Sequence, residues 1–204
     1  MPLPPLPDVR LLGLTGAPGV GKSTLAAALG RPVVAMDGFH YADVELVRRG
    51  LLDLKGAPET FDAEGYAALL RRVRCQEPEV VAPMFERDLE QPIAGAVWVP
   101  PTGPVVTEGN YLLLDEPRWR TVRAQVEVVW HLHVDRSVRL ERLVARHVLF
   151  GRSPADARAW VERVDEPNAR LVDAAASRAD LVVDLTTWTP SAVPTSAPPR
   201  TGPA

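Results

Sequence analysis

The chain has 204 residues with a formal net charge of −3, and 46% of them are hydrophobic, which indicates one folded domain rather than a disordered or fibrous chain. The slightly acidic charge argues against a dedicated binder of nucleic acid or anionic membranes. A single cysteine, Cys75, excludes an internal disulfide framework and a multi-thiolate zinc site, and no apolar run approaches the ~20 residues of a membrane helix. Because residues 1–10 also lack the features of a signal peptide, we expect a cytoplasmic protein.

Proline is concentrated at both ends of the chain. Four of the 21 prolines lie within residues 1–7 and five within residues 190–204. Such segments resist packing into regular structure. We therefore expect a flexible N-terminal tail at 1–7, a folded domain at 8–188 and a disordered proline-rich tail at 189–204.

The first part of the folded segment predicts strand, loop and helix in that order. Residues 9–15 are an apolar run typical of a buried strand, and a glycine-rich stretch follows at 16–21. Helix-forming residues then lead to Gly30, a glycine suited to a helix C-terminus. A second strand at 33–37 ends on an acid, Asp37.

The rest of the chain continues this alternation. Two short strands are predicted within 80–99 around the polar loop 86–93, and three more strands at 104–109, 127–135 and 180–186. Helices are predicted at 41–50, at 63–75 with Asp62 as N-cap, at 137–151 capped by Ser137, and at 153–177 with a break at Pro167. Strands that are apolar on both faces and alternate with helices are typical of an α/β fold, in which helices cover both sides of a mainly parallel sheet.

The glycine-rich stretch carries a phosphate-binding motif. Residues Gly16–Ser23 spell GAPGVGKS and match G-x-x-x-x-G-K-[ST], which composition alone would produce in roughly one such chain per thousand. Its backbone N–H groups and the following helix N-terminus attract phosphate, Lys22 would reach the β- and γ-phosphates, and Ser23 would ligate Mg²⁺. A chance glycine-rich turn is the alternative. The predicted phosphate cradle comprises Gly16, Ala17, Pro18, Gly19, Val20, Gly21, Lys22, Ser23 and Thr24.

Other motifs narrow the class of nucleotide-binding protein. Lys22 and Lys55 are the only lysines, and neither stands in the N-K-x-D motif of guanine-nucleotide switches, which argues against a GTPase switch.

Asp37 follows the second strand, so it should face the same crevice as the phosphate loop. There it could accept the proton of an attacking hydroxyl, although it could instead cap the next helix.

Five segments together resemble the superfamily of pantothenate kinase, uridine kinase and phosphoribulokinase: GAPGVGKST, MDGFHY, KGAPETFD, PMFERDLEQPI and EGNYLLLDE. The resemblance is nearest to the bacterial nucleoside/nucleotide kinase-like branch and runs from about residue 10 to residue 185. It implies a three-layer P-loop NTPase fold with a five-stranded parallel core, helices on both faces and a short lid. It also implies ATP and Mg²⁺ as cofactors.

The resemblance assigns roles to individual residues. Asp37 matches the catalytic acid, and Glu108 matches the acid that holds Mg²⁺ through water, unless Glu108 is a buried acid paired with an arginine. Lys55 could reach an anionic or polar substrate group, or it could be a solvated loop lysine. The acceptor side would include Phe39, His40, Phe85, Arg87 and Tyr111. His40 could equally be a structural donor, and Arg87 could pair with acids of its own loop.

The lid carries arginines. Arg139, Arg142 and Arg146 share one helix face, and Arg152 follows Gly151. The resemblance implies that lid arginines neutralise the transferring phosphoryl group and exclude water; we favour Arg142 and Arg152 as nucleotide contacts and Arg146 as a catalytic residue. The alternative is a solvated helix face. For Asn168, a helix N-cap is favoured over a lid contact.

These observations favour an ATP-dependent kinase that transfers the γ-phosphoryl group to a hydroxyl of a small metabolite, nucleoside-like or pantothenate-like. The alternative is an ATP-binding regulatory or accessory protein that hydrolyses ATP slowly and takes no small-molecule acceptor. The expected partner is the acceptor itself, with no nucleic acid and no membrane, and a homodimer is left open.

Overall fold

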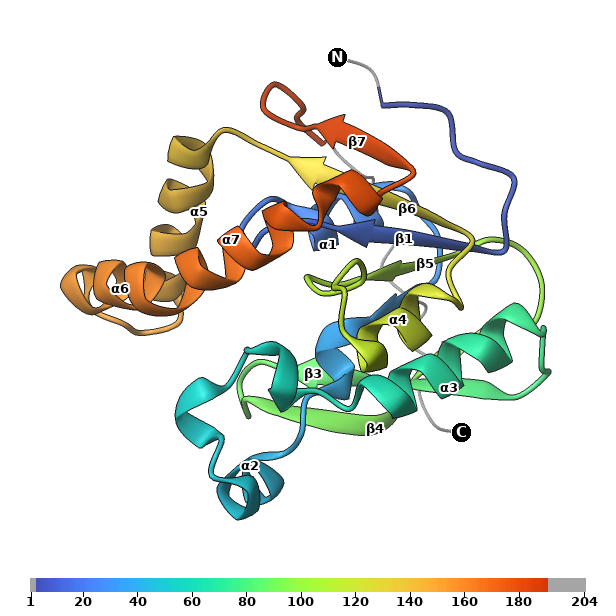
Figure 1. The fold of residues 1–204 in the computed structure, drawn as a ribbon, viewed down its shortest axis with the longest axis horizontal. Coiled ribbons are helices and arrows are strands. Elements are labelled where there is room, and N and C mark those ends of the chain that lie inside the picture. The colour runs from blue at the N-terminus through green and yellow to red at the C-terminus, as the bar shows by residue number, and fades with distance from the viewer. Residues whose placement is uncertain (1–2, 191–204) are drawn as a thin grey trace, which may run out of the picture.

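The computed structural model describes residues 3–190, and its centre is a five-stranded sheet (Figure 1). All neighbouring strands are parallel, which confirms the predicted α/β class and its five-stranded core. The strand order is β2-β5-β1-β6-β7, formed by β1 (Leu11–Thr15), β2 (Val33–Ala35), β5 (Val105–Glu108), β6 (Val128–His133) and β7 (Leu181–Asp184). Most of the predicted C-terminal tail, residues 191–204, lies outside the described residues.

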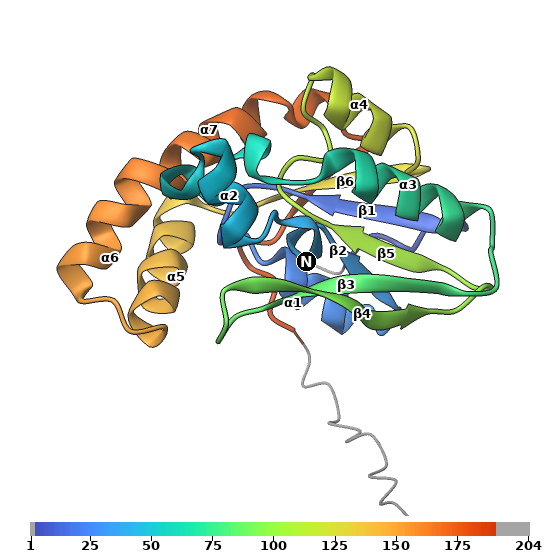
Figure 2. The same cartoon turned by 90° about the horizontal axis from the view of Figure 1, so that it is seen from below.

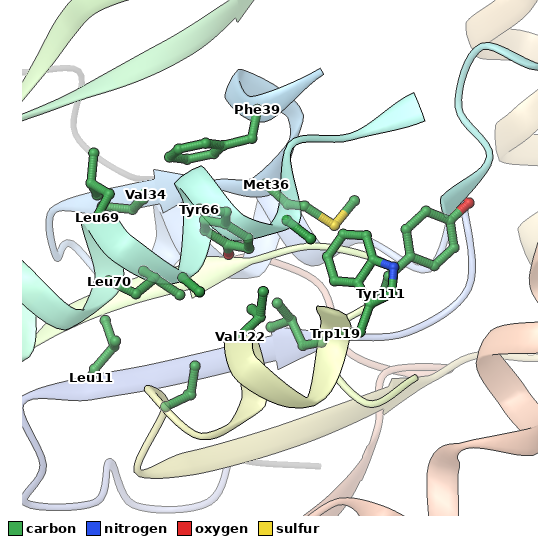
Figure 3. Close-up of a cluster of buried hydrophobic side chains, with 14 of the residues drawn as sticks. Leu11, Val34, Met36, Phe39, Tyr66, Leu69, Leu70, Tyr111, Trp119 and Val122 are labelled. Atoms are coloured by element: carbon green, nitrogen blue, oxygen red, sulfur yellow. The ribbon is translucent and has the colours of Figure 1, made fainter. Parts of the chain in front are cut away.

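The two faces of the sheet bury two separate apolar clusters. Successive strand residues point to opposite faces, so Leu11 packs in a cluster with α3 (Ala63–Arg74) and α4 (Pro117–Arg123), whereas Leu12 packs in a cluster with α1 (Lys22–Ala28). Figure 2 shows α3 and α4 on one side of the sheet and α1 on the other. Figure 3 shows the first cluster, in which Leu11 and Trp119 are completely buried. The helices therefore form the predicted outer layers.

A two-stranded antiparallel hairpin stands beside the main sheet. It consists of β3 (Val80–Glu86) and β4 (Gln91–Val99), which pair from Val80↔Val99 to Glu86↔Gln91. The connecting turn, 87–90, is shorter than the predicted polar loop 86–93, because Gln91, Pro92 and Ile93 pair within the ladder. The hairpin packs so closely on the turn after β2 that a Cβ on Gly38 would lie 2.4 Å from the Pro83 carbonyl oxygen.

The remaining helices gather around the carboxyl ends of the strands. They are α2 (Asp43–Arg49), α5 (Arg136–Leu149), α6 (Pro154–Trp160) and α7 (Glu166–Ala174). In Figure 1, α5 and α6 project beyond the strand ends at the left. Short 3₁₀ turns occupy Met36–Phe39, Leu52–Leu54, Pro58–Thr60 and Ala176–Arg178. The second strand consequently ends at Ala35, two residues before the prediction, and Asp37 lies in a 3₁₀ turn.

The helix termini confirm one predicted cap and correct another. Asp62 is the N-cap of α3, and its carboxylate accepts a hydrogen bond from the Gly65 amide at 2.9 Å. Ser137 is not the N-cap of α5. The helix begins at Arg136, because the Arg139 amide already donates to the Asp135 carbonyl oxygen, which leaves Ser137 inside the first turn.

The predicted break at Pro167 is a widened helical turn. Proline has no N–H to donate within a helix, and the chain accommodates it with a π turn over Val161–Asp165, in which the Glu166 amide donates to the Val161 carbonyl oxygen. Helical structure therefore continues from α6 into α7. Asn168 lies inside α7, so the predicted N-cap role is wrong.

The N-terminal segment is irregular but contacts the core. Residues 3–7 have no helix or strand, yet Leu3 packs against the second apolar cluster. Within residues 3–190, no helix is both long and apolar enough to span a bilayer.

Candidate functional site

A cleft of about 1010 Å³ lies at the carboxyl ends of the parallel strands. Ligands of open α/β sheets bind at this edge. The strand order places Asp37, after β2, at one side of the cleft, and Leu185, after β7, at the other. The glycine-rich loop follows the central strand β1, so it lies between them.

The loop between β1 and α1 wraps around the Lys22 side chain. The Lys22 ammonium donates to the carbonyl oxygens of Gly16 at 2.8 Å and Ala17 at 3.2 Å. Gly16 has a φ of +148°, and a Cβ there would lie 2.5 Å from the Leu132 carbonyl oxygen, so only glycine fits this close approach. The loop backbone is thereby curled with a cation at its centre.

Burial makes Lys22 an unusual lysine. Desolvation lowers the pKa of its ammonium to about 8, although Glu108 and Asp37 favour the charged form. Arg146 and Arg139 lower this pKa further. Burial destabilises the charged form of this side chain while no anion is bound. Phosphate oxygens that bind beside it would therefore stabilise the ammonium strongly.

A hydroxyl and a carboxylate face each other beside Lys22. The Ser23 Oγ donates to Glu108 Oε1 at 2.9 Å, and Glu108 is only 7% exposed. Burial and the nearby Asp37 raise the pKa of the Glu108 carboxyl, whereas Lys22 and the Ser23 hydrogen bond oppose this. Carboxylate and hydroxyl oxygens are ligands that suit Mg²⁺, which also keeps waters and substrate phosphates in its shell.

Asp37 faces an arginine from the hairpin. Arg87, in the turn between β3 and β4, places its Nη2 3.4 Å from Asp37 Oδ2, and both side chains are partly exposed in the cleft. The turn after β2 is held against β3 by the close approach at Gly38, which explains why these residues meet. An acid with water access and an adjoining cation is suited to bind a hydroxyl and take its proton.

His40 adds an aromatic wall to this end of the cleft. Its ring lies 3.9 Å from the Phe61 ring and 5.0 Å from the Phe85 ring, centroid to centroid. Burial lowers the pKa of the imidazole to about 4, although Asp37 opposes this. His40 is therefore a neutral hydrogen-bonding group at neutral pH.

Helix α5 crosses over the glycine-rich loop. Arg142 donates from Nη1 to the Val20 carbonyl oxygen at 3.4 Å, and Arg146 lines the cleft one turn further along. Arg139 is buried and bonds to Glu166 and to the Pro18 carbonyl oxygen, so it ties α5 to α7 and to the loop. Beyond α5, the Arg152 guanidinium stacks 4.0 Å above the Trp160 ring.

Among the known proteins that match most of this chain are two sequence relatives and one solved structure. A candidate uridine kinase of Schizosaccharomyces pombe is 34% identical and covers 76% of the chain and 73% of its own length. YggC of Escherichia coli is 34% identical and covers 85% of the chain and 76% of its own length. The crystal structure of a candidate fructose transport system kinase from Silicibacter sp. TM1040 is 42% identical with a TM-score of 0.77, covering 88% of the chain and 92% of its own. No protein-family model matches.

The chain belongs to the P-loop kinases. Identity at this level over most of both chains, together with the shared fold, places the kinase in the superfamily that its five sequence segments resemble. The glycine-rich loop Gly16–Ser23 is the segment of the kinase that carries the P-loop motif.

The residues present in the kinase fit a magnesium nucleotide. The loop offers backbone N–H groups, Lys22 supplies a cation, and Ser23 with Glu108 supplies oxygen ligands on the same side. Among residues 3–190 no cluster of three or more His, Cys, Asp or Glu side chains could hold a metal by itself. A metal here would need phosphate oxygens and waters to complete its shell, which is how Mg²⁺ is bound in kinases.

The cleft unites most of the predicted site residues of the kinase. Loop residues 18–24 line it, whereas Gly16 and Ala17 are not among its lining residues and accept hydrogen bonds from Lys22 through their carbonyl oxygens. The other residues weighed as site residues that line it are Asp37, His40, Lys55, Phe85, Arg87, Glu108, Arg142, Arg146, Arg152 and Asn168.

Two predicted acceptor contacts are instead part of the core. Phe39 is 8% exposed and packs on Tyr66, with ring centroids 4.6 Å apart (Figure 3). Tyr111 is completely buried, and its hydroxyl donates to the Gly56 carbonyl oxygen at 2.5 Å. In both cases the adjacent residue, His40 or Asn110, lines the cleft.

The structure adds cleft residues that the sequence did not reveal. Asp165 and His147 face each other at 2.9 Å on the lid side, and Trp160 lies nearby. Leu185 and Trp188 line the far side after β7. The rule that strand carboxyl ends face the ligand would have singled out the β7 end, but the Asp165–His147 pair had no sequence signal.

Proposed function

We propose that this P-loop kinase transfers the γ-phosphoryl group of ATP to a hydroxyl of a small metabolite, with Mg²⁺ as cofactor. The observation that supports this most strongly is the placement of Asp37 on the same cleft as Lys22 and the Ser23–Glu108 pair. A hydroxyl beside Asp37 would face the terminal phosphate of a nucleotide held by the loop. An ATP-binding regulatory protein would not require an acid at this place.

The cleft residues would divide the proposed reaction into separate tasks. The loop amides and Lys22 would hold the phosphates, and Ser23 with Glu108 would hold the metal and its water. Mg²⁺, when bound, would neutralise phosphate charge and help to orient the γ-phosphoryl group. Asp37 accepts the proton of the acceptor hydroxyl as its oxygen bonds to the γ-phosphorus, and the bond from that phosphorus to the bridging oxygen of ADP breaks.

The arginines of the lid and the hairpin complete the site. Arg142, Arg146 and Arg152 would neutralise the charge that spreads over the transferring group and help to exclude water. Arg87 would orient the acceptor next to Asp37, while neutral His40 and Phe85 form the wall against which it lies. The names of two relatives point to a nucleoside and to a sugar, so a nucleoside-like acceptor is first in the test, with pantothenate-like and sugar acceptors beside it.

The test is a panel of nucleosides, pantothenate and sugars, screened for acceptor-stimulated release of ADP from MgATP. We expect at least one acceptor to stimulate ADP release and to gain one phosphoryl group. Asp37→Asn should bind MgADP as the wild type does but lose transfer by roughly 10²–10⁴-fold, and Lys22→Ala should abolish turnover. Slow hydrolysis that no acceptor stimulates would favour the regulatory alternative, and full transfer by Asp37→Asn would remove Asp37 from the role of base.

A further inference from the structure

Lys55 bridges two segments that surround the acceptor end of the cleft. Its ammonium donates to Asp43 Oδ1 at 2.7 Å and to the Glu90 carbonyl oxygen at 2.5 Å. Asp43 is the first residue of α2, and Glu90 is the last residue of the turn between β3 and β4. The Lys55 side chain is 19% exposed and lies over the Phe85 ring. Lys55 therefore links three separate parts of the chain.

A second hydrogen bond joins the same two segments. The Asp43 amide donates to Gln91 Oε1 at 3.0 Å. Asp43 thus contacts the hairpin through its backbone directly and through its carboxylate by way of Lys55. We call this set, Asp43, Lys55, Glu90 and Gln91, the hairpin clasp.

The clasp holds the turn at a strained residue. Glu90 has a φ of +52°, and among the described residues only Gln76 is another non-glycine residue with positive φ. A left-handed conformation of such a residue is unfavourable unless its surroundings hold it. The Glu90 carbonyl oxygen is the atom that Lys55 binds, so the clasp acts directly on the strained peptide.

The turn that is held in this way places Arg87 next to Asp37. Arg87 is the first residue of the turn. Its Nη2 lies 3.4 Å from Asp37 Oδ2, and both residues line the cleft. We propose that Lys55 is a positioning residue of the kinase: it fixes the β3–β4 turn, and through the turn it fixes Arg87 beside Asp37. This inference rests on the proposed function, because it gives Lys55 its task through residues of the acceptor site.

A direct role of Lys55 is the competing explanation, because its side chain also lines the cleft. The two explanations differ in what happens to the turn. A clasp residue changes the motion of the turn when it is removed, whereas a mere acceptor ligand changes only binding. They differ also in energetic coupling, since a residue that acts through Arg87 cannot add its full effect once Arg87 is gone.

The first experiment measures amide hydrogen exchange in the Lys55→Met variant, and it needs no acceptor. We expect exchange to accelerate at least fivefold in peptides that contain Asp43 and residues 86–92, with the phosphate loop unchanged. Lys55→Arg should restore protection, because a guanidinium can also bridge Asp43 and the Glu90 carbonyl. Asp43→Asn, which removes the charge from the clasp, should reproduce the acceleration in part.

A matched control is available in the connection between α3 and β3. Arg72 also bridges a carboxylate and a backbone carbonyl, those of Glu77 and Glu79, but it lies outside the cleft. Arg72→Met should leave exchange in residues 86–92 at the wild-type rate. Unchanged exchange of these residues in both Lys55→Met and Asp43→Asn would overturn the proposal.

The second experiment uses an acceptor identified in the panel. Lys55→Met should lower kcat/KM for the acceptor at least tenfold, leave MgADP affinity within twofold of the wild type, and be partly rescued by Lys55→Arg. The Lys55→Met/Arg87→Met double variant should be no more impaired than Arg87→Met alone. Additive losses with an unchanged turn would show that Lys55 is an acceptor ligand. If no acceptor is found, the proposed function fails, and the exchange experiment still decides whether the clasp holds the turn.

Discussion

The Ser23 hydroxyl donates to the Glu108 carboxylate across 2.9 Å, and this contact joins the first residues of α1 to the end of β5. Both oxygens are positioned before any metal enters. We expect Glu108→Gln to raise the half-saturating Mg²⁺ concentration for ATP turnover roughly 10- to 100-fold, because an amide cannot offer an anionic oxygen to a bound metal or its water. Titration of turnover with Mg²⁺ at saturating ATP checks this, and an unchanged midpoint would exclude Glu108 from the metal site.

The Lys22 side-chain amine should take up a proton when nucleotide binds at alkaline pH. Its pKa of about 8 in the free protein means that it is largely neutral at pH 8.5, and phosphate oxygens favour the charged form. We expect uptake of about three-quarters of a proton at pH 8.5 and about a tenth at pH 7 when MgADP binds. Calorimetry in buffers of different ionisation enthalpy measures this number.

The matched variant for this measurement is Lys22→Arg. Its guanidinium stays charged throughout the range, so proton uptake should disappear even where binding survives. Equal uptake by the wild type and Lys22→Arg would assign the proton to another group.

His40 should make the stability of the kinase depend on pH below neutrality. Its pKa is about 4 when folded, against 6.5 for an unperturbed histidine, so the unfolded chain binds a proton in this interval that the folded chain does not. Stability is therefore lost as pH falls from about 6.5 to 4, by on the order of 2–3 kcal/mol. Urea unfolding at several pH values should show a shallower decline for His40→Gln, and parallel declines would contradict this.

Tyr111→Phe should reduce stability without changing acceptor affinity. The buried hydroxyl is the donor to the Gly56 carbonyl oxygen, and its removal leaves that oxygen without this partner, at a cost of about 1–2 kcal/mol. Denaturant unfolding gives the free energy, and the acceptor KM should stay within twofold. A large rise in KM at wild-type stability would return Tyr111 to the acceptor site.

The sequence predicted the parts of this protein whose chemistry dictates residue type and spacing. The loop Gly16–Ser23 needs glycines, a lysine and a hydroxyl in a fixed order, and the sheet needs apolar strands between helices. Side-chain direction was harder to predict. Phe39 and His40 are neighbours in one motif, but the 3₁₀ turn after β2 directs Phe39 into the core and His40 to the cleft.

The sequence pattern did not predict which side chains pair when they are far apart in the chain. Arg139 shares a helix face with Arg142 and Arg146, which the spacing predicted, yet its guanidinium binds Glu166, 27 residues away. The Pro167 position suggested a helix end, whereas a π turn absorbs the missing N–H and keeps the helix running. Such outcomes depend on which segments meet in three dimensions.

The π turn also binds α5 through its last residue and the residue after it. It presents two consecutive carboxylates to α5: Glu166 binds Arg136 and Arg139 near the start of that helix, and Asp165 binds His147 near its end. Arg139 and His147 are about 12 Å apart along the helix axis at 1.5 Å per residue. Because α5 is bound at two separate points to Asp165 and Glu166, we expect α5 and the start of α7 to move together as one rigid unit whenever this side of the cleft closes on a ligand.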